Sequence, residues 1–95
     1  MASKRDLKKD ITLLIEQVIS DALDVAGKQE KEADQKAVLD VIIELTELHN
    51  QLIDRSNHPD GKDDPKLVKK HYRKIIEDLL AGCDNAYQKL GKIAA

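Results

Sequence analysis

The sequence predicts an all-α fold, an up-down-up antiparallel bundle of three helices, from three observations. Apolar residues recur at helical spacing along three long segments of the 95-residue chain. Glycine and proline are scarce inside those segments, which favours long helices. The chain has no Phe or Trp, so its core must be aliphatic, which suits helix-on-helix packing better than a ring-lined ligand pocket. At this length we expect a single domain, residues 1–95.

The first helix is predicted to span residues 3–26. Ser3 can accept a hydrogen bond from a free amide of the first turn, and Asp6 three residues later completes a weak capping box. Gly27 is predicted to end the helix, because glycine readily adopts the positive φ of a helix C-cap. The apolar stripe covers about half of the circumference and consists of Leu7, Ile11, Leu14, Ile15, Val18, Ile19, Ala22, Val25 and Ala26.

The second helix is predicted to span residues 31–56, and its apolar surface is unusually wide. One stripe consists of Val38, Val41, Ile42, Leu45, Leu48 and Leu52. Leu39, Ile43 and Ile53 widen it to about two-thirds of the circumference, whereas a surface helix needs little more than about 100°. This helix must therefore be covered on several sides, by the rest of the chain or by a second copy.

The third helix is predicted to span residues 65–94, after a loop at 57–64. Asp64 can cap the helix, and Pro65 suits the first helical position, where an N–H group is not needed. Gly82 and Ala86 lie four residues apart on the apolar face, which predicts close approach of a neighbouring helix. The three helices have similar lengths, so they can pack side by side along their full extent.

Some aliphatic residues lie outside the stripes that the bundle needs. Leu39, Ile43 and Ile53 on the second helix and Leu80 on the third are the candidate protein interface, and Leu13 and Leu23 are similar outliers on the first. Burying such side chains stabilises an interface by roughly 1.5–3 kcal/mol each when the burial is complete. The sequence therefore predicts that the bundle dimerises, into a larger bundle, or binds a helical protein partner.

Composition restricts the location and the partners. The formal net charge of −2 gives no general attraction to nucleic acid or to an anionic membrane. Cys83 is the single cysteine, which excludes an intramolecular disulfide and a Cys-rich metal site. The charged N-terminus is followed by no continuous apolar run, and no segment is long enough to span a membrane. We expect a cytoplasmic protein with no membrane association.

The candidate chemical groups are few, and no catalytic residue, metal ligand or cofactor is predicted. His49 lies in the apolar stripe of the second helix, where we expect a neutral imidazole hydrogen-bonded near Thr46 or to Tyr72. No Glu stands three residues before a histidine, as a di-metal carboxylate bundle requires. The acidic loop 58–64 lacks the residue order of a calcium-binding EF-hand. Cys83 has no histidine at helical spacing and is expected to be a buried free thiol.

Two basic clusters support an alternative function. One consists of Lys4, Arg5, Lys8 and Lys9, and the other of Lys66, Lys70, Arg73 and Lys74. In an up-down-up bundle the first and third helices start at the same end, so both clusters form one basic end. The sequence predicts a non-catalytic interaction or scaffold module, with a nucleic-acid or polyanion-binding accessory protein as the alternative.

Overall fold

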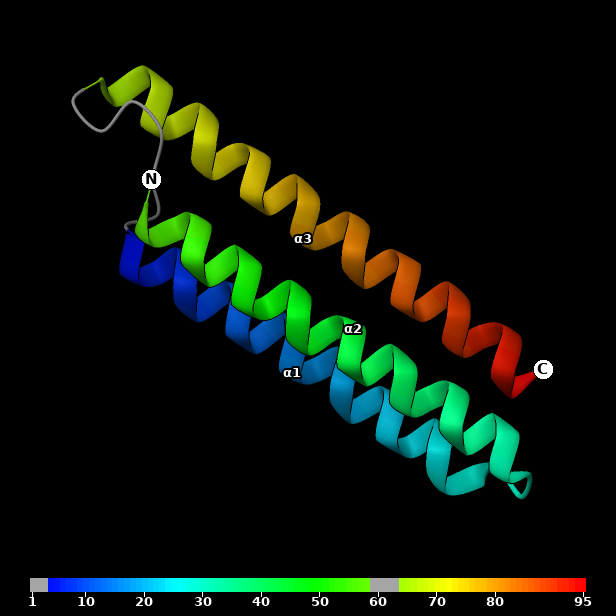
Figure 1. The fold of residues 1–95 in the computed structure, drawn as a ribbon. Helices are drawn as coiled ribbons and strands as arrows, with labels where there is room; N and C mark the ends of the chain where they lie inside the picture. The colour runs from blue at the N-terminus through cyan, green and yellow to red at the C-terminus, as the bar shows by residue number, and fades with distance from the viewer. Residues whose placement is uncertain (1–3, 59–63) are drawn as a thin grey trace.

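The computed structural model describes residues 4–58 and 64–95 and confirms the all-α three-helix bundle (Figure 1). α1 spans Lys4–Lys28, α2 spans Glu32–Asn57 and α3 spans Pro65–Ala94. Every helix packs against both others, and the molecule measures 53 × 18 × 18 Å. α1 and α3 start at the same end and α2 runs between them in the opposite direction (Figure 1). Within the described ranges, no helix is long and apolar enough to cross a membrane.

The helix ends follow the predicted signals closely, with one correction. Asp64 caps α3, because its carboxylate accepts a hydrogen bond from the Lys66 amide at 3.0 Å. Lys31 precedes α2 without a side-chain cap. The prediction that Gly27 ends the first helix is wrong: α1 continues to Lys28, and the turn is closed instead by the Gln35 side chain, which donates to the Gln29 carbonyl at 2.8 Å. The Ser3 cap and most of the predicted loop lie outside the described residues.

The core is aliphatic and runs the length of the bundle between the three helices. Its buried members are Leu7, Ile11, Ile15, Val18 and Ala22 on α1, Val38, Val41, Leu45 and Leu52 on α2, and Ile75, Leu79, Cys83, Ala86 and Leu90 on α3. The spacing of three or four residues within each set places them on one face of each helix. Ser56 is also fully buried, and its hydroxyl donates to the Ile53 carbonyl at 2.7 Å, so its polar group has a partner in the core.

The close helix approach predicted at Gly82 is present. A Cβ atom at this position would overlap the Cδ2 atom of Leu48 on α2. Glycine therefore lets α2 and α3 approach while the Leu48 side chain fills the space that another residue would occupy.

Candidate protein-interaction surface

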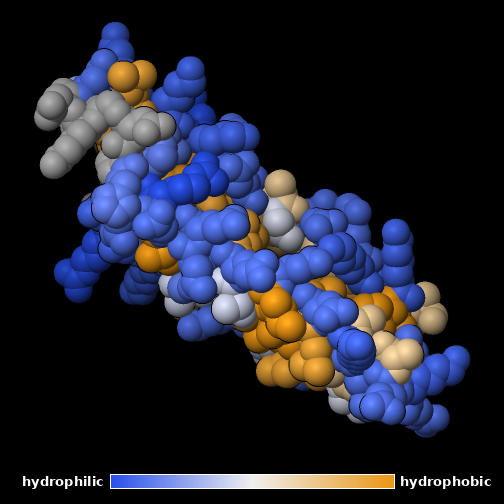
Figure 2. All heavy atoms as spheres, viewed as in Figure 1, coloured by the Kyte–Doolittle hydropathy of each residue, from blue (hydrophilic) through white to orange (hydrophobic). Residues whose placement is uncertain are grey.

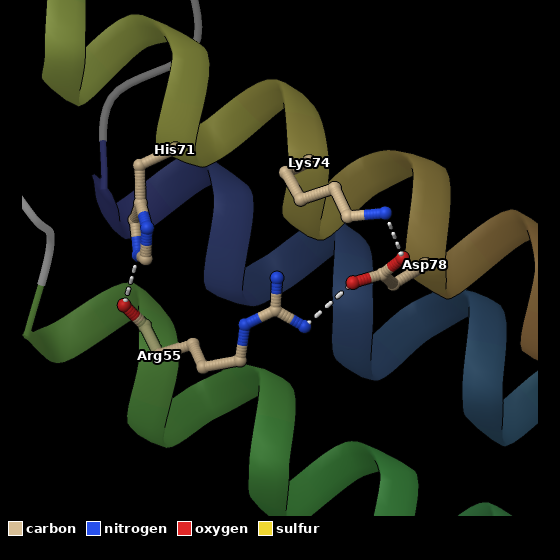
Figure 3. Close-up of polar contacts among 4 residues, drawn as sticks. All are labelled: Arg55, His71, Lys74 and Asp78. Carbon is tan, nitrogen blue, oxygen red and sulfur yellow. Dashed lines mark hydrogen bonds and ion pairs between the residues drawn. The ribbon is translucent and has the colours of Figure 1, made fainter.

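A polar cluster fixes the end of α2 against α3 (Figure 3). The Arg55 guanidinium donates to a carboxylate oxygen of Asp78 at 2.8 Å, and Lys74 approaches the other oxygen at 3.1 Å. These hydrogen bonds, from Arg55 first and then Lys74, lower the pKa of Asp78 below its ordinary 3.8. The Nε2 atom of His71 lies 2.7 Å from the Arg55 carbonyl, so Nε2 carries the proton and donates. These polar side chains therefore bind one another across the α2–α3 edge of the same chain.

Other polar contacts join the edges of the remaining helix pairs. Lys89 of α3 contacts Glu44 of α2 at 2.7 Å. Tyr87 of α3 donates to an Asp21 carboxylate oxygen of α1 at 2.5 Å, and this hydrogen bond raises the pKa of the phenol to about 12. Ion pairs therefore join α2 to α3, and a hydrogen bond to a carboxylate joins α1 to α3.

His49 packs against α1. Its Nε2 atom lies 2.9 Å from the Thr12 hydroxyl, and its Nδ1 atom lies 3.4 Å from the side-chain oxygen of Asn50. A proton on Nδ1 satisfies both contacts, because Nδ1 then donates to Asn50 and Nε2 accepts from Thr12. The alternative partner Tyr72 is wrong, because His49 lies on the side of α2 that faces α1; its partner Thr12 lies near Thr46, which lines the same hollow. The contact also fixes the register of these two antiparallel helices.

That register brings exposed aliphatic residues of α1 and α2 together. Since Thr12 lies level with His49, each step forward along α1 matches one step back along α2. Leu23 therefore lies level with Val38, one residue from Leu39, and Ile19 lies level with Ile42, one residue from Ile43. Leu23 is 56% exposed, Leu39 and Ile43 are each 55% exposed, and Ile19 is half-buried. We call these four residues the α1–α2 patch.

The α1–α2 patch lies in the half of the bundle nearer the turn between α1 and α2. Figure 2 shows strongly hydrophobic side chains at the surface over this part of the two helices, surrounded by hydrophilic ones. Ile53, the third α2 residue of the predicted interface, is half-buried and packs against the core, so the fold already covers much of it. Leu23 adjoins the predicted interface residue Leu39 because of how α1 and α2 pack. The periodicity of a single helix does not contain this information.

Leu80, the fourth predicted interface residue, belongs to a separate surface between α1 and α3. It is 55% exposed, as Leu39 and Ile43 are, and it lies one turn after the exposed Ile76. Ile76 lines a shallow hollow together with Leu13, Leu14 and Asp10 of α1. We call Leu13, Leu14, Ile76 and Leu80 the α1–α3 patch. The predicted interface residues therefore divide between two faces of the bundle.

The two basic clusters lie at the end of the bundle where α1 and α3 start (Figure 1). Lys4, Arg5 and Lys8 line an open hollow of about 420 Å³. On α3, Lys66, Lys70 and Arg73 are exposed, whereas the ammonium group of Lys74 contacts Asp78. One of the predicted polyanion contacts is thus partly neutralised within the chain.

Groups of catalytic or metal-binding character are sparse in the part of the chain that the structure describes. No three His, Cys, Asp or Glu side chains in residues 4–58 and 64–95 lie close enough to hold a metal ion. Cys83 is buried as predicted, and burial raises the pKa of its thiol, so the thiolate that would act as a nucleophile is disfavoured. The acidic loop considered for calcium falls mainly on residues 59–63, outside the described ranges.

Comparison of the chain with protein-family models, with curated proteins and with solved structures finds no match.

Proposed function

We propose that this protein is a non-catalytic helical interaction module, which acts by self-association or by binding a helical protein partner. The observation that carries the proposal is the α1–α2 patch, in which exposed aliphatic residues of two neighbouring helices adjoin. Single exposed leucines are ordinary on protein surfaces, whereas adjoining ones mark interaction sites. Such a role needs only a rigid surface, which the bundle supplies.

The energetics support a modest affinity. Leu23, Leu39 and Ile43 have already buried nearly half of their surface, so covering the rest stabilises a complex by about 1 kcal/mol each. Association also has entropic costs, and the rim of the patch is polar. We expect a dissociation constant in the micromolar range. The proposal includes a cytoplasmic location, which the lone unpaired Cys83 supports.

Sedimentation equilibrium of the wild type, Ile43→Lys and Leu80→Lys tests the proposal. The two variants make a matched pair, because both place a charge at a helical site with a 55% exposed aliphatic side chain. We expect association of the wild type at about 100 μM, its loss in Ile43→Lys, and its retention in Leu80→Lys. A wild type that stays monomeric at this concentration would refute self-association, and loss only in Leu80→Lys would move the interface to the α1–α3 patch.

A second candidate function is polyanion binding at the basic end. It is favoured because α1 and α3 begin at the same end of the bundle, which brings the two basic clusters together. The exposed Arg5, Lys70 and Arg73 and the half-buried Lys8 could contact phosphates there. This function predicts binding to a DNA or RNA oligonucleotide that weakens steeply as salt is added. The absence of binding at low salt would remove it. Lys70→Glu should weaken any such binding, while Leu39→Lys should not.

A further inference from the structure

We infer that the occupant of the α1–α2 patch is a second copy of this chain, bound antiparallel across a two-fold axis. This inference rests on the proposed function and specifies its partner. The axis lies in the plane of the patch, perpendicular to the helices, at the level between Ile19 and Leu23. It places α1 on α1 of the second copy and α2 on α2 of the second copy, with opposite directions.

The apolar residues of the patch match under this operation. Leu39 and Ile43 are one helical turn apart on α2, at equal distances from the axis. Leu39 therefore meets Ile43 of the second copy, and Ile43 meets its Leu39. On α1, Ile19 and Leu23 exchange in the same way. Every aliphatic side chain of the patch meets another aliphatic side chain.

Two charges beside the patch match in this direction, whereas Asp40, which is also exposed next to Leu39, lies close to the level of Asp40 of the second copy. Lys36 lies three residues before Leu39, and Glu47 lies four residues after Ile43, both exposed on the outer side of α2. The antiparallel operation places Lys36 beside Glu47 of the second copy. At a rise of 1.5 Å per residue, the two residues differ by only about 2 Å in their level along the helices. The same contact forms twice by symmetry. A parallel dimer would instead put Glu16 of α1 about 3 Å along the helices from the level of Glu47 of the second copy, acid near acid.

On α2 the apolar part of this surface is short. Leu39 and Ile43 are aliphatic, whereas Lys36, Thr46 and Asn50 on the same side are polar, so the apolar contact of α2 with the second copy is limited to about one helical turn. This side of α2 faces away from the core residues Val41, Leu45 and Leu52.

The overlap is small but sufficient for a weak dimer. The two copies overlap over about seventeen residues of each helix, or about 26 Å, on a bundle 18 Å wide. The buried surface is then roughly 900 Å² in total, below the range of about 1,200–2,000 Å² for stable specific interfaces and within that of weak, transient ones. We therefore expect a dissociation constant of tens of micromolar rather than nanomolar.

The α1–α3 patch fits the same operation less well. An antiparallel two-fold axis across Leu14 and Leu80 would bring α1 against α1 of the second copy, and this face of α1 carries Asp10 and Asp21. Acidic residues would then approach acidic residues, which disfavours that pairing.

Disulfide trapping of two single-site variants tests the arrangement. Lys36→Cys and Glu47→Cys proteins, one carrying a size tag, are mixed under reversible oxidation, and the unsubstituted chain controls for the buried Cys83. We expect the disulfide dimer that links position 36 to position 47 to exceed the 36–36 and 47–47 dimers about tenfold. The two copies of position 36, or of position 47, lie about 14 Å or more apart along the helices. Predominance of like-with-like products would overturn the antiparallel arrangement.

Charge reversal provides an independent readout without cysteine. Lys36→Glu alone should weaken the dimer roughly threefold to tenfold, since two exposed pairs are lost. The double variant Lys36→Glu with Glu47→Lys should restore the affinity. Absence of this rescue, in a wild type that does associate, would overturn the second-copy register while leaving the proposed function intact. A monomeric wild type would overturn the second-copy arrangement together with the self-association in the proposed function.

Discussion

At the residue scale, single polar contacts at the helix edges stabilise the bundle only modestly but have distinct pH signatures. Among the residues that the structure describes, Tyr87 and Asp78 are the two acidic groups that have both a hydrogen-bonded partner on another helix and a shifted pKa. Their shifts have opposite signs, because the Tyr87 phenol donates to a carboxylate, whereas the Asp78 carboxylate accepts from cations. Each shift therefore predicts a change in stability at a different end of the pH scale.

Tyr87→Phe should lower the free energy of unfolding by about 0.5 kcal/mol near neutral pH, because an exposed hydrogen bond to Asp21 is lost. The folded-state pKa of about 12 is above the ordinary value of 10.0, so the contribution of Tyr87 is complete below pH 10 and is lost as pH rises toward 12. Urea unfolding of the wild type and the variant across this range checks the effect. A spectroscopic titration of Tyr72→Phe, in which Tyr87 is the remaining phenol, should give a pKa of about 12; an ordinary value of 10.0 would contradict it.

Asp78→Asn should make the bundle less sensitive to acid. The Arg55 and Lys74 contacts lower the pKa of Asp78 below 3.8, so this carboxylate stabilises the fold above that pH and stops doing so as pH falls through its folded-state pKa. At neutral pH we expect a loss of about 0.5 kcal/mol, because the side chain is partly solvated. Unfolding curves at neutral pH and below about pH 3 give the comparison. An equal acid-induced loss in wild type and variant would show that Asp78 does not contribute.

At the element scale, the effect of helix propensity on stability can be separated from the effect of helix packing, because α3 contains one glycine packed against α2 and one with open space beside it. Gly82→Ala and Gly91→Ala make the same change within α3. Nothing lies near a Cβ at Gly91, so alanine there should raise the free energy of unfolding by about 0.5 kcal/mol through helix propensity. At Gly82 the methyl group meets Leu48, so the same gain should be cancelled or reversed. Thermal unfolding of both variants gives the comparison, and equal stabilisation by the two would contradict the close α2–α3 approach.

The start of α3 depends on Asp64. Asp64→Ala should lower the free energy of unfolding by about 1 kcal/mol, since the Lys66 amide loses its acceptor. Asp64→Asn should retain most of the stability, because an amide oxygen can accept the same hydrogen bond. Chemical denaturation measures both. Equal losses in the two variants would show that the charge rather than the cap geometry matters.

Local signals predicted most of the elements, and tertiary register accounts for the differences. Asp64 and Pro65 fixed the start of α3 because capping is a local property of the chain. α1 continues past Gly27 to Lys28, where the Gln29 amide donates to the Ala26 carbonyl; the Gln35 side chain also contacts the Gln29 carbonyl, and that contact requires the turn to be formed. His49 was recognised as unusual, but its partner Thr12 follows only from how α1 and α2 pack.

At the whole-molecule scale, the wide apolar surface of α2 becomes two surfaces with separate roles. Periodicity identified Leu39 and Ile43 as surplus to the core, and both are 55% exposed. It could not show that Ile53 is covered by the fold, that Leu23 joins Leu39, or that Leu80 lies on another face, since each depends on the position of a second helix. The fold was therefore more predictable than the division of its surface.

Small-angle X-ray scattering over a concentration series tests the central claim, that the bundle pairs with a second copy across the α1–α2 patch. An isolated chain has a Cα radius of gyration of 15.4 Å. Side-by-side antiparallel copies displaced along the bundle should raise the radius to roughly 19 Å and double the scattering mass as the concentration passes tens of micromolar. A radius that stays near 15.4 Å with a monomer mass throughout would contradict the account.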